Sequence, residues 1–377
     1  MNSLKGKQTV YIDCYQGVFP ENDPQSTVSF AKMISPAFDF EVPPFAKDVP
    51  FFATSEIYGL PHVTVSRAKS SAGRFTRTMR TMARHGMDQI LLVCYTRGHL
   101  TMTIAGKTKR VEAGDFAFID LSQEVTIEAP VVENVSLAVS RRRLEPMVPF
   151  LDDAHGFVRP QGPLTTILRG VMENVIAVGP GLPVSEAGAV ADTIIQLAAA
   201  CLEPLSSQPN EARSGRRAVS LAAIKAAIEQ RLSGSELTLH TLIDDFGITR
   251  STLYRMFEPL GGVSAYINER RLRHAFRRMA DAMEPEIRIS QLAFDLGFSH
   301  PSAFTRAFKK LFGMSPKDVR RLASQSKTEE MELMASRDLL QYLRPIERQS
   351  FTISGLDRVP GQAGNVGAAE TADFARA

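Results

Sequence analysis

The sequence predicts an α+β protein of more than one domain: an N-terminal antiparallel β-barrel with helices, and a C-terminal domain that is all helical. Its 377 residues exceed the length of one typical domain. Short strand-like runs separated by glycine turns occupy the region from Phe51 to Leu137. Beyond residue 239, apolar residues recur at helical spacing, and a glycine interrupts that pattern in the same way twice. The last third therefore predicts a double helix-turn-helix.

Within the first region, the strands are indicated by their residue types and spacing. Gln89–Thr96 is a continuous apolar run of the kind that forms a buried strand, and Leu100–Ile104 alternates with a period of two. Turn residues at Gly98 and Gly106 separate these runs, and Phe116–Asp120 continues the series. Many short antiparallel strands joined by glycine turns are typical of a small barrel or a jelly roll.

Helical spacing follows the strands. We expect helices at Leu144–Phe150, Leu164–Val178 and Ser185–Leu202. The third of these is rich in small and apolar residues. Two arrangements fit it equally well: it packs on its own barrel, or it pairs with a second subunit in a homodimer.

Changes in composition set the expected domain boundaries. The polar stretch at residues 206–215 contains Pro and Gly and shows neither helical nor strand periodicity, so it predicts an interdomain linker. The end of the chain combines an amphipathic pattern at Glu329–Leu343 with a Gly- and Ala-rich segment from Gly355 that is typical of disorder, and no function is indicated for it. We expect four parts: the barrel and its helices at 1–205, the linker at 206–215, the double helix-turn-helix domain at 216–326, and the extra helix and tail at 327–377.

The more distinct helix-turn-helix pattern runs from Leu292 to Pro316. Its first helix has an apolar face, Gly297 permits the left-handed backbone of a turn, and Gly313 with Pro316 ends the second helix. We expect Ser299 or Ser302 to cap that second helix. Its buried stripe consists of Phe304, Phe308, Leu311 and Phe312.

A second copy of the pattern lies upstream, at Leu239–Phe257. Gly247 stands at the turn, and Thr249 is a natural N-cap for the following helix. Between the two copies, Ser264–Met283 has a long helical period with an arginine-rich side that we expect to be exposed. A rigid helix of this length would fix the separation of two reading helices, which could then occupy successive major-groove segments about 34 Å apart.

The positive charge of the chain is concentrated in the segment that contains the two helix-turn-helix patterns. From Arg213 to Ser326 there are 19 Lys or Arg and 11 Asp or Glu, a net charge of +8, whereas the rest of the chain carries −5. A basic segment on a chain that is otherwise not basic is the electrostatic footprint of a nucleic-acid-binding domain. Double-stranded DNA is therefore the expected partner.

The last third of the chain resembles the AraC/XylS family of bacterial transcription regulators. The residues that carry the resemblance are Ile289, Leu292, Ala293, Leu296, Gly297, Phe298 and Ser299, then Phe304, Arg306, Phe308 and Lys309, then Phe312, Gly313, Ser315, Pro316 and Arg320. The resemblance implies a sequence-specific DNA-binding regulator that acts at promoters with RNA polymerase as a partner. Activation is more typical of this family than repression.

The resemblance also implies roles for individual residues. Arg255 and Arg306 are suited to donate two hydrogen bonds to guanine, whereas Ala303 offers only an apolar contact. Contacts to phosphate would position the protein without specifying sequence. The expected base-contacting residues are Ser251, Tyr254, Arg255, Ser302, Ala303 and Arg306, and the expected phosphate-contacting residues are Thr249, Arg250, Ser299, His300, Lys309 and Lys310.

The N-terminal part resembles the cupin-like sensory domain of that family, which implies a small-molecule effector. An alternative is that the aromatic residues simply fill the barrel and the arginines are solvated. The candidate effector-binding residues are Arg67, Arg74, Tyr95, Arg97, Met102, Phe116 and Phe118. A second alternative is a regulator without an effector, controlled by its own abundance or by a protein partner.

An enzyme built on the barrel is the alternative from another class. A metal-dependent cupin enzyme needs clustered histidines with a carboxylate, whereas His62, His85 and His99 are scattered. We therefore expect no catalytic residues, no metal and no cofactor.

Cysteine usage and hydropathy bear on location. Cys14, Cys94 and Cys201 are far apart and odd in number, which suits a reducing compartment. The N-terminus lacks an apolar core for export, and no run of about twenty apolar residues is evident, so we expect a cytoplasmic protein without membrane spans.

Overall fold

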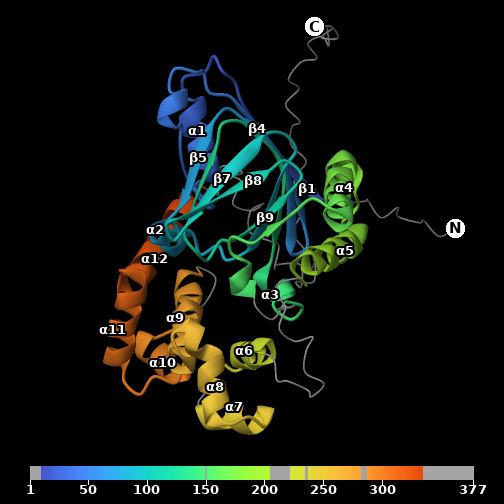
Figure 1. Cartoon of the computed structure of the whole chain (residues 1–377). Coiled ribbons are helices and arrows are strands. Elements are labelled where there is room, and N and C mark those ends of the chain that lie inside the picture. Colours follow the sequence, from blue (N-terminus) through green and yellow to red (C-terminus); the bar gives the residue numbers. More distant parts are fainter. Residues whose placement is uncertain (1–9, 149–150, 204–220, 234–236, 282–286, 334–377) are drawn as a thin grey trace, which may run out of the picture. The chain divides into compact units, whose positions relative to one another are not determined.

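The computed structural model describes residues 10–148, 151–203, 221–233, 237–281 and 287–333 (Figure 1). Its N-terminal part consists of two antiparallel sheets, so the predicted antiparallel barrel followed by helices is confirmed. The seven-stranded sheet has the order β1 (Asp13–Phe19), β3 (Ala53–Leu60), β4 (Val63–Ser70), β11 (Val132–Val139), β6 (Ile90–Tyr95), β9 (Phe116–Asp120) and β12 (Val158–Arg159). The five-stranded sheet has the order β2 (Asp39–Glu41), β5 (Gly73–Arg77), β10 (Val125–Ala129), β7 (His99–Ile104) and β8 (Lys107–Glu112).

A core of apolar side chains fills the space between the two sheets. Leu100 and Met102 point into it from β7, at the alternate positions that the sequence pattern indicates. Strand β6 is buried on both faces, because Val93 and Tyr95 belong to this core while Leu92 and Cys94 belong to a second one. Burial on both faces explains why β6 is a continuous apolar run in the sequence.

The second core lies under helices α4 (Pro163–Val178) and α5 (Val184–Leu202), which the short turn η3 (Gly179–Gly181) connects and which cover the outer face of the seven-stranded sheet (Figure 1). Helix α5 is long and apolar enough to cross a membrane by length and composition alone. Eight of its side chains are buried, including Ile194 and Leu202 in the core beneath it. Of the two arrangements that the sequence allowed, packing on its own barrel is therefore present in the chain.

The helix expected at Leu144–Phe150 is wrong in position. The structure has a single helical turn, α3 (Arg141–Leu144), and the short 3-10 segment η2 (Leu151–Ala154), while residues 149–150 lie outside the described ones. The Arg141 guanidinium explains this local structure, because it is buried and donates to Asp120 at 2.5 Å and to Asp152 at 2.6 Å. A buried charge needs such partners, and here they connect α3, β9 and η2.

Before β6, three short helical elements were not predicted: α1 (Ser26–Ile34), η1 (Pro44–Ala46) and α2 (Met79–His85). Thr78 caps α2 by accepting from the Thr81 N–H at 3.2 Å. Met82 and Ala83 of α2 are buried in the same cluster as Phe276 and Val319 of the helical region.

The C-terminal region is all helical, as predicted. Its elements are α6 (Leu221–Gln230), α7 (Leu239–Phe246), α8 (Arg250–Phe257), η6 (Glu258–Leu260), α9 (Val263–Ala280), α10 (Ile289–Asp295), α11 (Pro301–Phe312) and α12 (Pro316–Leu333). Helix α12 continues into the start of the separate helix that the sequence suggested at Glu329–Leu343. The predicted linker at 206–215 and the segment from Gly355 lie outside the described residues, so those boundaries stay predictions.

Candidate nucleic-acid interface

The first helix-turn-helix unit is formed by α7 and α8, as the sequence predicts. Helix α7 begins at a capping box in which Thr238 accepts from the Thr241 N–H, and it ends at Gly247, whose φ of 58° is left-handed. Thr249 then caps α8 by accepting from the Thr252 N–H at 3.2 Å. Each end of the turn is thus fixed by a local hydrogen bond or by a glycine.

The apolar side chains of this unit face inward. Leu242, Leu253 and Phe257 are fully buried and pack with Val263 at the start of α9. With these residues in the core, the opposite face of α8 is left to solvent. Ser251, Tyr254 and Arg255 are exposed there, which is the position that a reading helix requires.

The second unit is formed by α10 and α11. Gly297 has a φ of 74°, as the turn requires, and Phe304 and Phe308 of α11 are fully buried. The ring of Phe276, on α9, stacks on Phe308 with centroids 6.1 Å apart and contacts Phe312 at 4.8 Å. The aromatic stripe of α11 therefore attaches the second unit to α9.

The predicted cap of α11 is wrong. His300, and not Ser299 or Ser302, is the N-cap residue, and its side chain makes no capping hydrogen bond. Pro301 occupies the first helical position, where its fixed φ and missing N–H are tolerated. The proline thus starts the helix without a serine cap.

The connecting helix α9 is confirmed, but its arginine-rich side is not the exposed face that the sequence suggested. Arg270 is buried and makes a paired contact with Glu229, with one N–H···O distance of 2.9 Å, and it also donates to Asp152. Arg271 is also buried. Arginine spacing alone does not distinguish a solvated face from one whose charges are paired with carboxylates of other elements.

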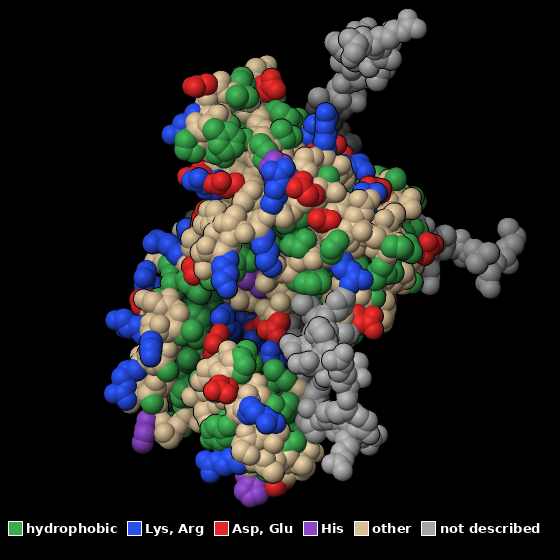
Figure 2. All heavy atoms as spheres, viewed as in Figure 1, with side chains coloured by type: hydrophobic (Ala, Val, Ile, Leu, Met, Phe, Trp, Pro, Cys, Tyr) green, Lys and Arg blue, Asp and Glu red, His purple; other side chains and the backbone are tan. Residues whose placement is uncertain are grey.

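The predicted DNA-contacting residues fall into two groups by unit. On α11 and the turn before it, Ser299, His300, Ser302 and Arg306 are exposed, and Ala303 is half-buried. On α8, Thr249 and Arg250 join the exposed group. Lys309 and Lys310 are exposed toward the end of α11, where Figure 2 shows Lys and Arg side chains along the outer side of α11 and α12.

Comparison with known proteins agrees with this geometry. A family profile described as a helix-turn-helix domain matches residues 242–322, which run from α7 to α12. The relatives that share this region are transcriptional regulators. The C-terminal region is an AraC-type helix-turn-helix domain. The predicted resemblance and the predicted class, a DNA-binding transcription regulator, are thereby confirmed.

Two relatives show how far the similarity extends. The transcriptional activator NphR of Rhodococcus sp is 24% identical over 268 residues, which cover 69% of this chain and 77% of NphR. The transcriptional activator RhrA of Rhizobium meliloti (strain 1021) is 32% identical over 105 residues, covering 28% of this chain and 33% of RhrA. The similarity to NphR therefore reaches beyond the AraC-type domain.

Two solved structures are similar over a large part of the chain. The AraC-like transcriptional activator CuxR is 20% identical and covers 70% of this chain and 95% of its own, with a TM-score of 0.49. ToxT from Vibrio cholerae O395 is 11% identical and covers 72% of this chain and 97% of its own, with a TM-score of 0.36.

Outside the AraC-type domain, the structure separates the candidate effector residues. Tyr95 and Met102 lie in the core between the two sheets, where burial raises the pKa of the Tyr95 hydroxyl. Phe116 and Phe118 lie in the other core, beneath α4 and α5. The four apolar side chains therefore face two different cores and do not line one common space.

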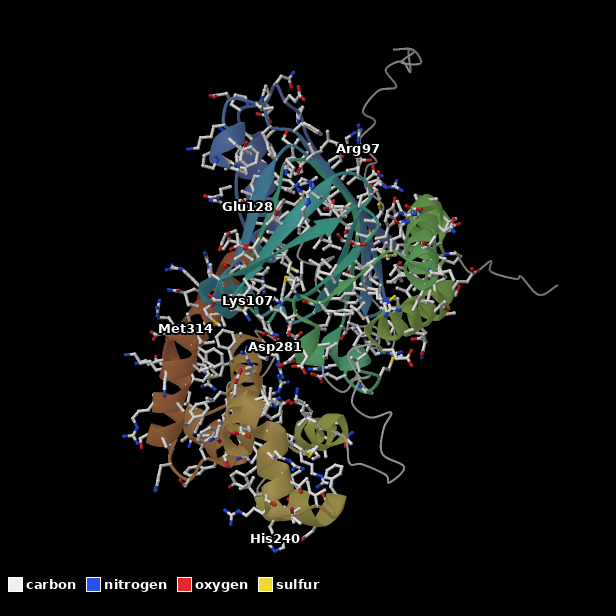
Figure 3. All side chains as sticks on the ribbon, viewed as in Figure 1. Arg97, Lys107, Glu128, His240, Asp281 and Met314 are labelled. Atoms are coloured by element: carbon white, nitrogen blue, oxygen red, sulfur yellow. The ribbon has the colours of Figure 1, made fainter. Side chains whose placement is uncertain are left out.

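The three candidate arginines lie at the surface of the barrel. Arg74 contacts Glu128 and donates to Glu41 at 2.8 Å, so that its charge is already paired. Arg67 is 3.9 Å from Glu56. Arg97 lies on the exposed loop between β6 and β7 (Figure 3). Among the described residues, no group of three or more His, Cys, Asp and Glu side chains could hold a metal ion.

Sequence reasoning missed one residue that shapes the second unit. Arg271 of α9 packs against the turn at Gly297, and its Nε is buried with no hydrogen-bond partner among the described atoms. Burial lowers the pKa of this guanidinium. The sequence could have indicated this contact only through the helical spacing that places Arg271 on the inner face of α9. The neighbouring arginines made that face look solvent-exposed.

Proposed function

We propose that this chain reads two successive major-groove segments of a promoter through α8 and α11 and thereby activates transcription. One observation carries the proposal. Both helices present exposed polar and basic side chains, while their apolar faces pack on opposite ends of the same connecting helix, α9. A single stiff helix between two readers suits two grooves about 34 Å apart.

Within each reader, the side chains divide by chemistry. The exposed Arg255 and Arg306 are free of ion pairs among the described residues and can donate two hydrogen bonds to guanine. The base-contacting set comprises Ser251, Tyr254, Arg255, Ser302, Ala303 and Arg306. The phosphate-contacting set comprises Thr249, Ser299, His300, Lys309 and Lys310.

For the barrel we propose regulation of DNA binding in the cytoplasm, through a small-molecule effector or a second copy of the chain. Tyr95 and Met102 are the residues through which an effector between the sheets would act. Any such coupling requires an effector that binds the two states of the regulator with different affinity. Contact with RNA polymerase would then convert DNA binding into activation, which is the role that NphR and RhrA are named for.

A second candidate is a regulator that takes no effector. The packing between the sheets favours it, because Leu100, Met102 and Ile119 leave at most 1% of their surface exposed. Thermal-shift measurements against aromatic acids, amines and sugars separate the two candidates. A shift in melting temperature that saturates with ligand concentration supports the effector, and its absence across these classes supports the second candidate.

The decisive experiment is selection of bound fragments from genomic DNA by the purified full-length chain at physiological ionic strength. We expect enrichment of a few promoter fragments that share a two-part sequence. A double variant, Arg255→Ala with Arg306→Ala, should lose this enrichment while still binding DNA weakly through phosphate contacts. If the wild-type chain showed no preference over random DNA, with and without candidate effectors, the proposed function would be wrong.

A further inference from the structure

Two exposed side chains on α8 are in contact with each other. The Arg250 guanidinium lies over the ring of Tyr254, 5.5 Å from its centroid, and its Nη2 is 3.5 Å from the Tyr254 Oη. The two residues are one helical turn apart, so they are neighbours on the same face. The hydrogen bond to Tyr254 raises the pKa of Arg250. An arginine that the sequence suggests as a phosphate contact is thus already held by an aromatic residue.

The direction of the Arg250 side chain is the informative feature. Arg250 is the first residue of α8, directly after the N-cap Thr249. A cation at this end of a helix is repelled by the positive end of the helix dipole, whereas the face of an aromatic ring attracts it. Its guanidinium accordingly lies one turn further along α8, over Tyr254, on the face where Ser251 and Arg255 are also exposed.

A guanidinium held in this way has a restricted orientation. The guanidinium is held over the Tyr254 ring and by the contact of its Nη2 with the Tyr254 Oη, which leaves Nε and Nη1 as donors on this exposed face of α8. Two parallel N–H donors in a fixed plane match the O6 and N7 acceptors of guanine in the major groove, and a phosphate contact needs no such orientation. We infer that Arg250 reads a guanine base and that Tyr254, which the proposed function places in the base-contacting set, also positions the Arg250 guanidinium through its ring. The inference rests on the proposed function.

The second reader has no counterpart of this pair. When the N-caps Thr249 and His300 are aligned, Pro301 corresponds to Arg250 and Thr305 to Tyr254. The Thr305 hydroxyl donates to the Pro301 carbonyl, a contact within the helix. The two halves of the operator should therefore differ: the half read by α8 contains a guanine that the half read by α11 does not require.

The test uses the fragments that the wild-type chain enriches. Arg250→Lys keeps the charge but loses the planar pair of donors, so it separates a base contact from a phosphate contact. We expect this variant to lose about 10-fold to 100-fold discrimination at one guanine of the α8 half-site, with the salt dependence of binding almost unchanged. Tyr254→Leu should lose part of the discrimination at that same position, and Tyr254→Phe should retain it because the ring remains. Arg321→Lys, an exposed site on α12, is the matched control.

The outcomes separate the two proposals. If Arg250→Lys kept the wild-type preference while Arg250→Ala weakened all sequences equally and flattened the salt dependence, Arg250 would be a phosphate contact and the inference would be overturned. If Tyr254→Leu kept full discrimination at the affected guanine, the positioning role of Tyr254 would be overturned. Failure of the wild-type chain itself to select any fragment would instead contradict the proposed function. Both residues are exposed, and far-UV circular dichroism checks that each variant is folded.

Discussion

The guanidinium of Arg271, on α9, packs against Gly297 at the turn of the second helix-turn-helix unit. A β-carbon at Gly297 would lie 2.8 Å from both terminal nitrogens of Arg271, and Arg271 is only 8% exposed. Gly297 therefore serves two purposes. It adopts the left-handed backbone of the turn, and it leaves room for the Arg271 side chain, which packs against the turn from the connecting helix.

Gly297→Ala should destabilise the protein more than Gly247→Ala. Both glycines are at the turn of a unit and have positive φ, of 74° and 58°, but a β-carbon at Gly247 meets nothing within 4 Å. The backbone cost of about 1–2 kcal/mol is common to both variants. The end of the Arg271 side chain must also move in Gly297→Ala, and because it is buried we expect this to add about 1 kcal/mol. Urea unfolding of the two variants checks this, and equal losses of unfolding free energy would show that Arg271 gives way without cost.

The features that the sequence predicted correctly are those determined by contacts between residues close together in the chain. The turns at Gly247 and Gly297, the cap at Thr249 and the buried stripe of α11 each follow from residues within a few positions of one another, and each was predicted. The N-cap of α11 was predicted wrongly, because Ser299, Ser302 and Pro301 each favour a different first residue for this helix.

Contacts between distant segments were beyond such reasoning. Arg271 reaches Gly297, and Arg270 reaches Glu229, 41 positions away. Tyr95 and Phe116 are both aromatic residues on strands, and only the sheet order shows that they face different cores. The individual base contacts stay predictions, since they depend on DNA.

Arg306→Ala should weaken binding to the cognate operator by about 1–3 kcal/mol and relax the preference at one base position. Arg306 is exposed on α11, and truncating it removes both donors from the edge of a guanine. Titration of the wild-type and variant proteins against operators changed one base pair at a time measures the effect. An equal loss on every sequence would show that Arg306 does not read a base.

Lys309→Ala should weaken binding to every sequence by a similar factor and reduce the slope of log K against log salt concentration by about 1. Lys309 is exposed near the end of α11, where a cation can neutralise a phosphate without reaching a base. Affinities at several salt concentrations give the slope. A slope equal to that of the wild-type protein would exclude a phosphate contact.

The buried pair of Asp120 and Arg141 should make the stability of the barrel sensitive to acid. Asp120 is fully buried and also accepts from the Ser122 N–H at 2.8 Å and from Gln123 at 3.0 Å. Burial alone would raise the pKa of Asp120, but Arg141 and these hydrogen bonds outweigh it and hold the pKa below its usual range. Because the pKa is lower in the folded state, the stabilisation is complete above the unfolded-state pKa of about 4 and is lost as the pH falls further.

Asp120→Asn should therefore cost about 3–5 kcal/mol of unfolding free energy at neutral pH, because it leaves Arg141 buried without its closest carboxylate. Asp192→Asn is the matched control. Asp192 contacts Arg143 at the surface and is 63% exposed, so its loss should cost less than about 1 kcal/mol. Urea unfolding of both variants and the wild-type protein between pH 3 and pH 7 measures these differences in unfolding free energy. The gap between Asp120→Asn and wild type should narrow below about pH 4, and a gap that stayed constant would show that the ionised Asp120 carboxylate contributes nothing to stability.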